Sequence, residues 1–241
     1  MSVGLVRADW PAPAGIFAAT TTRAGGVSEG RWSSLNMAMH VGDRAESVAE
    51  NRRRFVADTG LPRAPVWLRQ VHGARVVRAA DGPPAEADAV ISDGRPIGIL
   101  TADCLPMLLC SDAGDEVAAL HCGWRSLAGG IVANTVAAMD SDPAELIGWL
   151  GPAISQPAFE VGGEVRDAFL GGADDAAPCF EPNDRGRWQA DLYGLARRCL
   201  AASGIACVHG GGLCTRADEE TFFSYRRDGE TGRMATVIAR L

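Results

Sequence analysis

Two histidines and a cysteine are the residues of this sequence best suited to metal chemistry. The chain has only four histidines; His72 follows one apolar run, and His121 ends another, 117–120. Cys104 lies between them, where an apolar run is interrupted at 101–106. Three possible ligands therefore end three expected strands, which is how an α/β enzyme assembles a site at one edge of its sheet. Two imidazoles and a thiolate suit zinc with a fourth position open to water or substrate, and a single copper ion is chemically allowed.

Spacing alone leaves a plainer interpretation of these residues open. Their separations match no compact zinc motif. A single histidine at a strand end is more often a surface or hydrogen-bonding residue, and Cys104 taken alone would be an ordinary core side chain. The metal site therefore needs support from elsewhere in the chain.

Apolar runs and turn residues predict the elements that would position these side chains. Short runs bounded by turns predict strands, and amphipathic segments predict helices. The expected strands are 16–23, 65–71, 74–78, 87–92, 97–101, 106–110, 116–121 and 145–150. The expected helices are 44–59, 129–139, 163–170 and 191–202, the last closed by Gly204. Strands interspersed with helices predict an α/β protein.

A single domain spanning residues 1–241 is the expected organisation. The polar segments 81–84 and 171–178 are too short to act as interdomain linkers. A chain of this length can bury roughly 70–75% of its unfolded surface, enough to support a buried polar site.

Charge and residue usage exclude several classes of function. Twenty-three basic residues against 30 acidic ones leave a net charge of −7, which argues against a nucleic-acid or anionic-membrane partner. All 23 are arginine, so chemistry that depends on lysine, including Schiff bases and the Walker P-loop, is excluded. Four histidines cannot furnish the copper centres of a true multicopper laccase.

The cysteines and the apolar runs favour a cytoplasmic location. Seven cysteines is an odd number and none forms a Cys-x-x-Cys pair, which speaks against a disulfide framework and a closed structural zinc site. No signal-peptide core is evident near the N-terminus, and no apolar run approaches ~20 residues.

A series of ordered motifs carries a resemblance along residues 16–241. They are TTRAGGVS at 21–28, SLN at 34–36, HVGD at 40–43, NR at 51–52, QVHG at 70–73, ADA at 87–89, TADC at 101–104, HCGWR at 121–125, IG at 147–148, GPAI at 151–154, FEVG at 159–162, DL at 191–192, CT at 214–215 and FFSYRRDG at 222–229. The chain thereby strongly resembles the YfiH-like family, whose members are variously described as laccase-domain polyphenol oxidase, purine nucleoside phosphorylase and peptidoglycan editing factor.

The resemblance implies a fold, a metal site and a reaction. The fold is a single-domain, layered α/β sandwich with mixed sheets, and His72, Cys104 and His121 hold the metal, Zn2+ or Cu2+. The reaction is phosphorolysis of adenosine, inosine, guanosine and methylthioadenosine, together with adenosine deamination, so purine nucleosides and phosphate are the expected partners. Asp103 is the candidate for proton transfer, although it could equally turn the chain or orient a ligand histidine.

Further residues are expected to contact phosphate or sugar. A negatively charged protein must concentrate positive potential locally to bind phosphate. The candidates are Arg23, Arg125 and Arg226, with Gln70, Asn36 and His40 also assigned to substrate, although a turn role is equally open for Asn36 and His40.

Two positions depart from the family pattern. Cys122 stands where the family usually has alanine, and Ser126 where it usually has glycine. Because side chains alternate along a strand, Cys122 should face away from the metal.

Other functions remain open at the sequence level. One is a hydrolase that removes serine from UDP-muramyl peptide precursors, and another is a copper-dependent polyphenol oxidase. A third is a non-catalytic partner-binding protein stabilised by its metal. The sequence leaves the oligomeric state undetermined.

Overall fold

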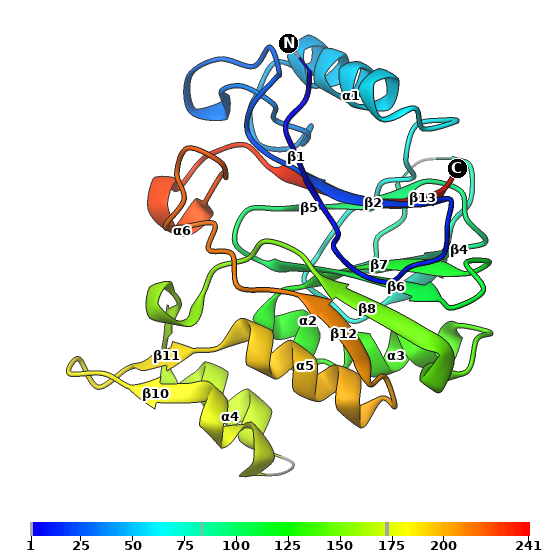
Figure 1. The fold of residues 1–241 in the computed structure, drawn as a ribbon. Coiled ribbons are helices and arrows are strands. Elements are labelled where there is room, and N and C mark those ends of the chain that lie inside the picture. The colour runs from blue at the N-terminus through cyan, green and yellow to red at the C-terminus, as the bar shows by residue number, and fades with distance from the viewer. Residues whose placement is uncertain (1, 83, 172–173) are drawn as a thin grey trace.

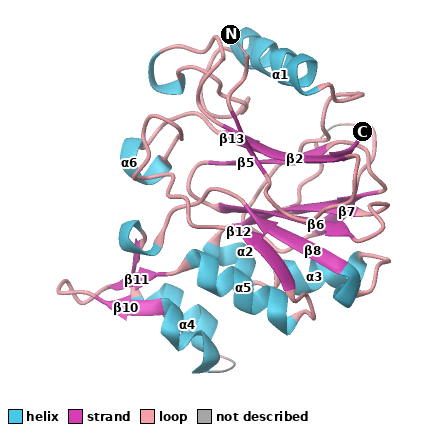
Figure 2. Ribbon diagram, in the orientation of Figure 1, coloured by secondary structure: helices cyan, strands magenta, loops and turns pink. Residues whose placement is uncertain are grey.

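The fold is layered, with helices on the two outer faces of a pair of stacked sheets (Figures 1 and 2). The computed structural model describes residues 2–82, 84–171 and 174–241, so Pro83 in the predicted loop 81–84 and positions 172–173 in the loop 171–178 lie outside the described residues. The six α-helices found in these ranges are α1 (Ala45–Thr59), α2 (Trp124–Ala128), α3 (Ile131–Ala138), α4 (Gly163–Leu170), α5 (Leu192–Ala202) and α6 (Tyr225–Asp228).

The two stacked sheets differ in size and direction. One is four-stranded and antiparallel, in the order β1 (Leu5–Arg7), β2 (Ile16–Thr21), β13 (Met234–Arg240) and β5 (Ile97–Thr101). The other is six-stranded and mixed, in the order β12 (Cys207–Gly210), β8 (Leu146–Leu150), β6 (Leu105–Ser111), β7 (Val117–Cys122), β4 (Ala89–Ser92) and β3 (Val76–Arg78). Its two outer pairs are parallel and its inner pairs antiparallel.

A small third sheet lies beside α4 and α5 (Figure 1). Its antiparallel strands are β10 (Phe180–Pro182), β11 (Trp188–Ala190) and β9 (Glu160–Val161). Short 3-10 turns at Gly30–Trp32, Pro143–Glu145, Gln156–Ala158 and Asp174–Cys179 complete the regular structure.

Three apolar clusters fill the spaces between the layers. Phe17 and Phe55 belong to the cluster between α1 and the four-stranded sheet. Ile99 and Leu108 belong to the cluster between the two sheets, and Met107 packs with Leu195 between the six-stranded sheet and its helices. Strand β6 is buried on both faces, which explains why it is a continuous apolar run rather than an alternating one.

Most predicted elements are confirmed, with ends shifted by one or two residues. Asp191 caps the N-terminus of helix α5, where its carboxylate accepts the N–H of Gly194, and Gly204 follows the end of the helix with a φ of 86°. The single-domain α/β fold with mixed sheets is also confirmed. No helix in the described ranges has the length and apolar character needed to cross a membrane.

The predicted strand 65–71 is wrong. Only isolated bridges form there, between Val66 and Ile97 and between Arg69 and Glu86. At the next position, the side-chain amide of Gln70 hydrogen-bonds to both the N–H and the carbonyl of Leu100. A side chain thus replaces the backbone ladder, and the segment continues as a loop.

Candidate functional site

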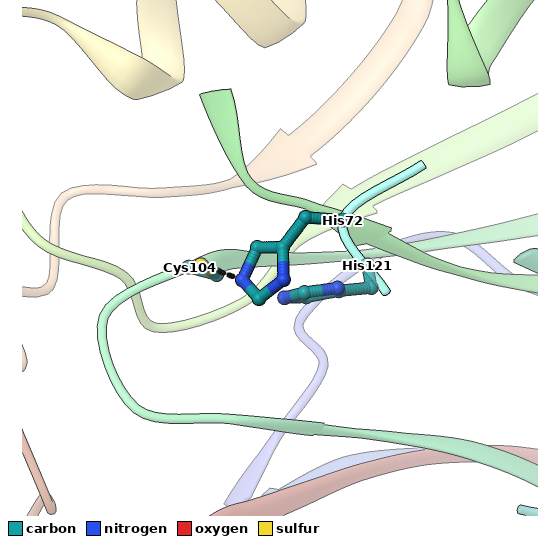
Figure 3. Close-up of side chains that lie close together, drawn as sticks. All are labelled: His72, Cys104 and His121. Atoms are coloured by element: carbon teal, nitrogen blue, oxygen red, sulfur yellow. Dashed lines mark hydrogen bonds between the residues drawn. The ribbon is translucent and has the colours of Figure 1, made fainter. Parts of the chain in front are cut away.

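The two predicted histidines and the cysteine come together at one end of the space between the sheets (Figure 3). His121 is the penultimate residue of β7, and Cys104 immediately precedes β6. His72 lies in the loop that follows segment 65–71, which was predicted as a strand. The ligand atoms of the three residues all lie within 4.8 Å of one another, and Sγ of Cys104 lies 3.9 Å from Nε2 of His72. Across residues 2–82, 84–171 and 174–241, this is the one such group of three or more potential ligands.

The donor set and its spacing fit a transition-metal ion. Tetrahedral zinc with these ligands would place the donor atoms roughly 3.3–3.7 Å apart, so the cluster needs only a small contraction. Gly123 makes the approach possible, because a Cβ there would lie 3.2 Å from both Sγ of Cys104 and Cδ2 of His72. The exposed position of His72 leaves one side of the cluster open to a ligand.

Asp88 organises both histidines, a role the sequence analysis did not assign. Its fully buried carboxylate accepts a hydrogen bond from Nδ1 of His121 at 2.8 Å. The same carboxylate accepts the backbone N–H groups of Val71, His72 and Gly73 at 2.7–3.2 Å. His121 therefore presents Nε2 to the cluster, and the loop carrying His72 is fixed with a φ of 60°. The sequence did carry an indication of this role, because Asp88 is an acidic residue within an apolar run, in the ADA motif at 87–89.

Electrostatics favour an ionised cysteine in the metal-free cluster. Burial opposes the thiolate, but the adjacent His121 and His72 outweigh it and lower the pKa of Cys104 to about 6. Burial also opposes the charged form of His121, yet Cys104 and Asp88 raise its pKa to about 9. The pair is therefore a thiolate and an imidazolium near neutral pH, and the thiolate is the form that binds metal.

The cluster opens into a pocket of about 480 Å³. Five other predicted site residues line it: His40, Gln70, Asp103, Arg125 and Arg226. Arg233, Tyr225, Trp124 and Phe159 also line it and were not predicted. The pocket thus combines a group of potential metal ligands, several basic side chains and aromatic rings, which suits a polar ligand with a flat ring.

Asp103 is held by two hydrogen bonds beside the cluster. Its carboxylate accepts the hydroxyl of Thr215 at 2.7 Å and the backbone N–H of Arg226 at 2.6 Å. Asp103 is only 8% exposed and has a φ of 92°, so it turns the chain before Cys104. These contacts favour a role in fixing the chain over proton transfer.

Two predicted substrate residues lie outside the pocket. Arg23 donates to the carbonyls of Ser33 and Glu219, and its guanidinium lies 4.9 Å from the ring centre of Phe223. Asn36 is fully buried and bonds to the Asp43 carboxylate and to backbone groups. Asn36 supports the pocket wall from behind through Arg233, whereas Arg23 lines a separate cavity.

Arg125 and Arg226 lie against aromatic side chains. The Arg125 guanidinium lies 4.3 Å from the ring centre of Trp124, and that of Arg226 lies 5.4 Å from the ring centre of Phe159. Arg226 also donates to the carbonyl of Glu160. Packing thus fixes both arginines at the wall of the pocket.

Cys122 faces away from the metal cluster. It is fully buried among the residues beneath the helices, and burial raises its pKa well above the ordinary value. Strand alternation therefore predicted its side correctly. Ser126 is also buried.

Comparisons with known proteins agree along nearly the whole chain. Residues 17–241 match the family model described as multi-copper polyphenol oxidoreductase laccase. The chain is 47% identical over 238 residues to purine nucleoside phosphorylase YfiH of Escherichia coli, covering 97% of this chain and 98% of that protein. It is 49% identical over 233 residues to a purine nucleoside phosphorylase of Pseudomonas aeruginosa, covering 95% and 96%.

Solved structures show the same fold. A Neisseria meningitidis protein of the DUF152 family superposes with a TM-score of 0.95 at 49% identity, covering 98% of this chain and 99% of that one. YlmD from Geobacillus stearothermophilus superposes with a TM-score of 0.90 at 30% identity, covering 98% and 96%.

Proposed function

Because this chain belongs to the family described as multi-copper polyphenol oxidoreductase laccase, and its relatives include enzymes named purine nucleoside phosphorylase, we propose that it is a zinc-dependent purine nucleoside phosphorylase. Its substrates are adenosine, inosine, guanosine and methylthioadenosine with phosphate, and it also deaminates adenosine. The observation that carries the proposal is the His72–Cys104–His121 cluster at a pocket lined by cations and aromatic rings.

Zinc fits the cluster better than a multicopper centre. The described residues hold one group of three possible ligands, and the chain has only four histidines in all. Zinc takes two imidazoles and a thiolate with one position open, whereas a trinuclear copper centre needs many more histidines. When bound, zinc would supply Lewis acidity and lower the pKa of a coordinated water.

The protein side chains bind and orient the substrate. Trp124, Phe159 and Tyr225 supply aromatic surface for a purine, with Arg125 and Arg226 packed beside the first two. His40 supplies a polar group on the pocket wall.

Three other predicted residues, Gln70, Asp103 and Asn36, act by holding the walls. Gln70 fixes the loop before His72 to β5, and Asp103 ties Cys104 to the segment carrying Arg226. Asn36 braces Arg233 from outside the pocket, whereas Arg23 joins the segments of Ser33 and Glu219 away from it.

Product analysis tests the proposal directly. The purified protein, with its metal content measured, is incubated with adenosine and phosphate, and products are identified by mass spectrometry. We expect adenine with ribose-1-phosphate from phosphorolysis of adenosine, inosine with ammonia from its deamination, and hypoxanthine with ribose-1-phosphate from phosphorolysis of that inosine. A parallel incubation with a serine-containing UDP-muramyl peptide detects the alternative hydrolase through free serine.

A matched pair of variants tests the metal assignment. His72→Ala should lose zinc and turnover, whereas His209→Ala should retain both. His209 is a suitable control because its Nε2 also lies near a cysteine, 3.3 Å from Sγ of Cys207, but on β12. A His72→Ala protein with full zinc and full turnover would show that the metal assignment is wrong.

A further inference from the structure

The least exposed of the three arginines that line the pocket has no acidic partner. Arg233 lines the pocket immediately before β13, and its Nη1 donates only to the carbonyls of Thr231 and Gly232, at 2.8 and 3.0 Å. No carboxylate lies within ion-pair distance of it among the residues the structure describes, and burial lowers the pKa of Arg233. A partly buried guanidinium without a counter-charge is costly, and a bound anion would offset that cost.

A histidine and another arginine gather around Arg233. His40 lines the same pocket, and burial followed by the charges of Arg233 and Arg52 lowers its pKa. Arg52 lies behind the wall, where Nε and Nη2 both donate to the carbonyl of Met37 and the guanidinium lies 4.7 Å from the ring centre of Trp67. Three basic groups therefore converge on one corner of a protein whose net charge is −7.

The acidic groups that act most on Arg233 are already engaged. Cys104 and then Asp103 contribute to the potential at Arg233, but Cys104 belongs to the group of metal ligands and the carboxylate of Asp103 accepts hydrogen bonds from Thr215 and Arg226. All three pocket arginines lie over aromatic rings, the guanidinium of Arg233 at 5.8 Å from the ring centre of Tyr225. Arg125 and Arg226 are exposed, however, whereas Arg233 is partly buried. A bound anion would therefore be most stabilising at the corner of the pocket formed by Arg233, where a partly buried positive charge has no counter-charge.

We propose that Arg233 and His40, with Arg52 behind them, form the phosphate subsite of this pocket. The identity of the anion rests on the proposed function, whereas the need for an anion rests on the unpaired guanidinium. The free Nη2 and Nε groups of Arg233 would donate to phosphate oxygens, and a guanidinium offers two parallel donors suited to that geometry.

Buried Asn36 positions this subsite. Its Oδ1 accepts the backbone N–H of Arg233 and that of Ala38, each at 3.0 Å. The N–H of Met37 in turn donates to the carbonyl of Arg233. The SLN and HVGD motifs therefore hold the loop of His40 against Arg233, and Asn36 acts as a positioning residue rather than as a phosphate ligand.

Calorimetric titration with inorganic phosphate tests the subsite. Adenine is added so that the base site is filled and no turnover occurs. We expect Arg233→Gln to raise the Kd for phosphate by roughly 10- to 100-fold, the effect of losing charge-assisted hydrogen bonds. His40→Gln should weaken binding less, and Arg233→Lys should recover part of the loss. Circular dichroism and zinc content check that each variant is folded and loaded.

Arg125→Gln and Arg226→Gln provide the decisive comparison. Both remove a pocket arginine, and both should change the Kd for phosphate by less than about threefold. Phosphate binding that survives Arg233→Gln, or that is lost in Arg125→Gln or Arg226→Gln instead, would overturn the assignment. Failure of the wild-type protein to bind phosphate, with or without adenine, would overturn it as well.

The titration also separates this inference from the proposed function. Binding of phosphate that depends on Arg233, without any nucleoside turnover, would support the subsite and contradict the phosphorylase. Adenosine monophosphate serves as a second probe for the source of the phosphate group. Tight, Arg233-dependent binding of the ester without binding of inorganic phosphate would contradict free phosphate as the ligand.

Discussion

The carboxylate of Asp88 lies 2.8 Å from Nδ1 of His121 and also accepts the backbone N–H of His72 at 2.9 Å. One buried side chain thus sets the tautomer of one metal ligand and the backbone position of another. The hydrogen bond from His121 leaves Nε2 free for the metal. Although burial opposes ionisation, the bonds from His121 and the Gly73 N–H lower the pKa of Asp88.

Asp88→Asn should weaken zinc binding by roughly 10- to 100-fold, the usual cost of losing a group that orients a metal ligand. An amide has one acceptor oxygen instead of two, so it can keep either the bonds that Oδ1 accepts from His121 and the His72 N–H or those that Oδ2 accepts from the Val71 and Gly73 N–H groups, but not both sets. Competition with a fluorescent zinc chelator measures the change in affinity.

Glu116→Gln is the matched control for this change. Glu116 is another buried carboxylate, and it accepts the backbone N–H groups of Asp140 and Ser141. We expect Glu116→Gln to lower stability without changing zinc affinity. Equal losses of zinc affinity in the two variants would mean that Asp88 acts only through general stability.

Asp103→Asn should raise the KM for nucleoside more than it lowers kcat. The amide can still accept the Thr215 hydroxyl, but its NH₂ group cannot accept the N–H of Arg226. The segment carrying Tyr225 and Arg226 would then lose its anchor. Steady-state kinetics across a range of pH separate the two parameters.

Thr215→Val distinguishes positioning from proton transfer. If Asp103 positions the chain, Thr215→Val should produce a similar rise in KM, and the double variant should be less than additive. A fall in kcat of roughly 100-fold or more with Asp103→Asn alone, together with loss of a limb of the pH profile, would instead identify a proton carrier.

The layered core was largely predictable because its elements carry strong local patterns. Strand β6 is a long apolar run, and α1 is an amphipathic segment ended by Gly60 with a φ of 69°. Strand β13 was missed although it is apolar, and the short strands β9 to β11 carry too little pattern to detect. The predicted strand 65–71 failed because a side chain, Gln70, provides the hydrogen bonds that a strand would take from backbone.

The metal ligands were predictable from residue type, whereas their supporting residues were not. His72, Cys104 and His121 are rare ligand types at the ends of apolar runs. Among 23 arginines, nothing local marks Arg233, because its importance comes from its partial burial without an acidic partner in the folded chain. Asn36 was wrongly expected to be able to reach substrate, because the sequence does not show that this side chain is buried in the folded chain.

Alkylation of the metal-free protein should report the ionisation of Cys104. Because its pKa is lowered to about 6, the thiolate forms as pH rises through about 6, and the rate should be near its plateau by pH 7.5. Below pH 6 the thiol is protonated and the rate should fall. Iodoacetamide labelling, followed by peptide mass spectrometry at each pH, measures this residue separately.

Cys110 and zinc provide the controls for this experiment. Burial and nearby acidic residues raise the pKa of Cys110 to about 12, so it should remain unlabelled across the same range. Added zinc should suppress labelling of Cys104. A rate that rises only above pH 8, as for an ordinary thiol, would contradict the thiolate–imidazolium pair.

Tyr193→Phe should lower the free energy of unfolding by about 1–3 kcal/mol, because it leaves a buried amide without a partner. The hydroxyl of Tyr193 accepts the N–H of Ala153 at 2.8 Å and donates toward the carbonyls of Gly151 and Leu213. It thereby joins the segment after β8 to the segment that carries Thr215. Tyr225→Phe, at the chain's other tyrosine, is the control, since Tyr225 is 60% exposed and should change stability by less than about 0.5 kcal/mol. Urea unfolding of both variants measures the difference, and equal stabilities would show that the buried hydroxyl does not hold these segments together.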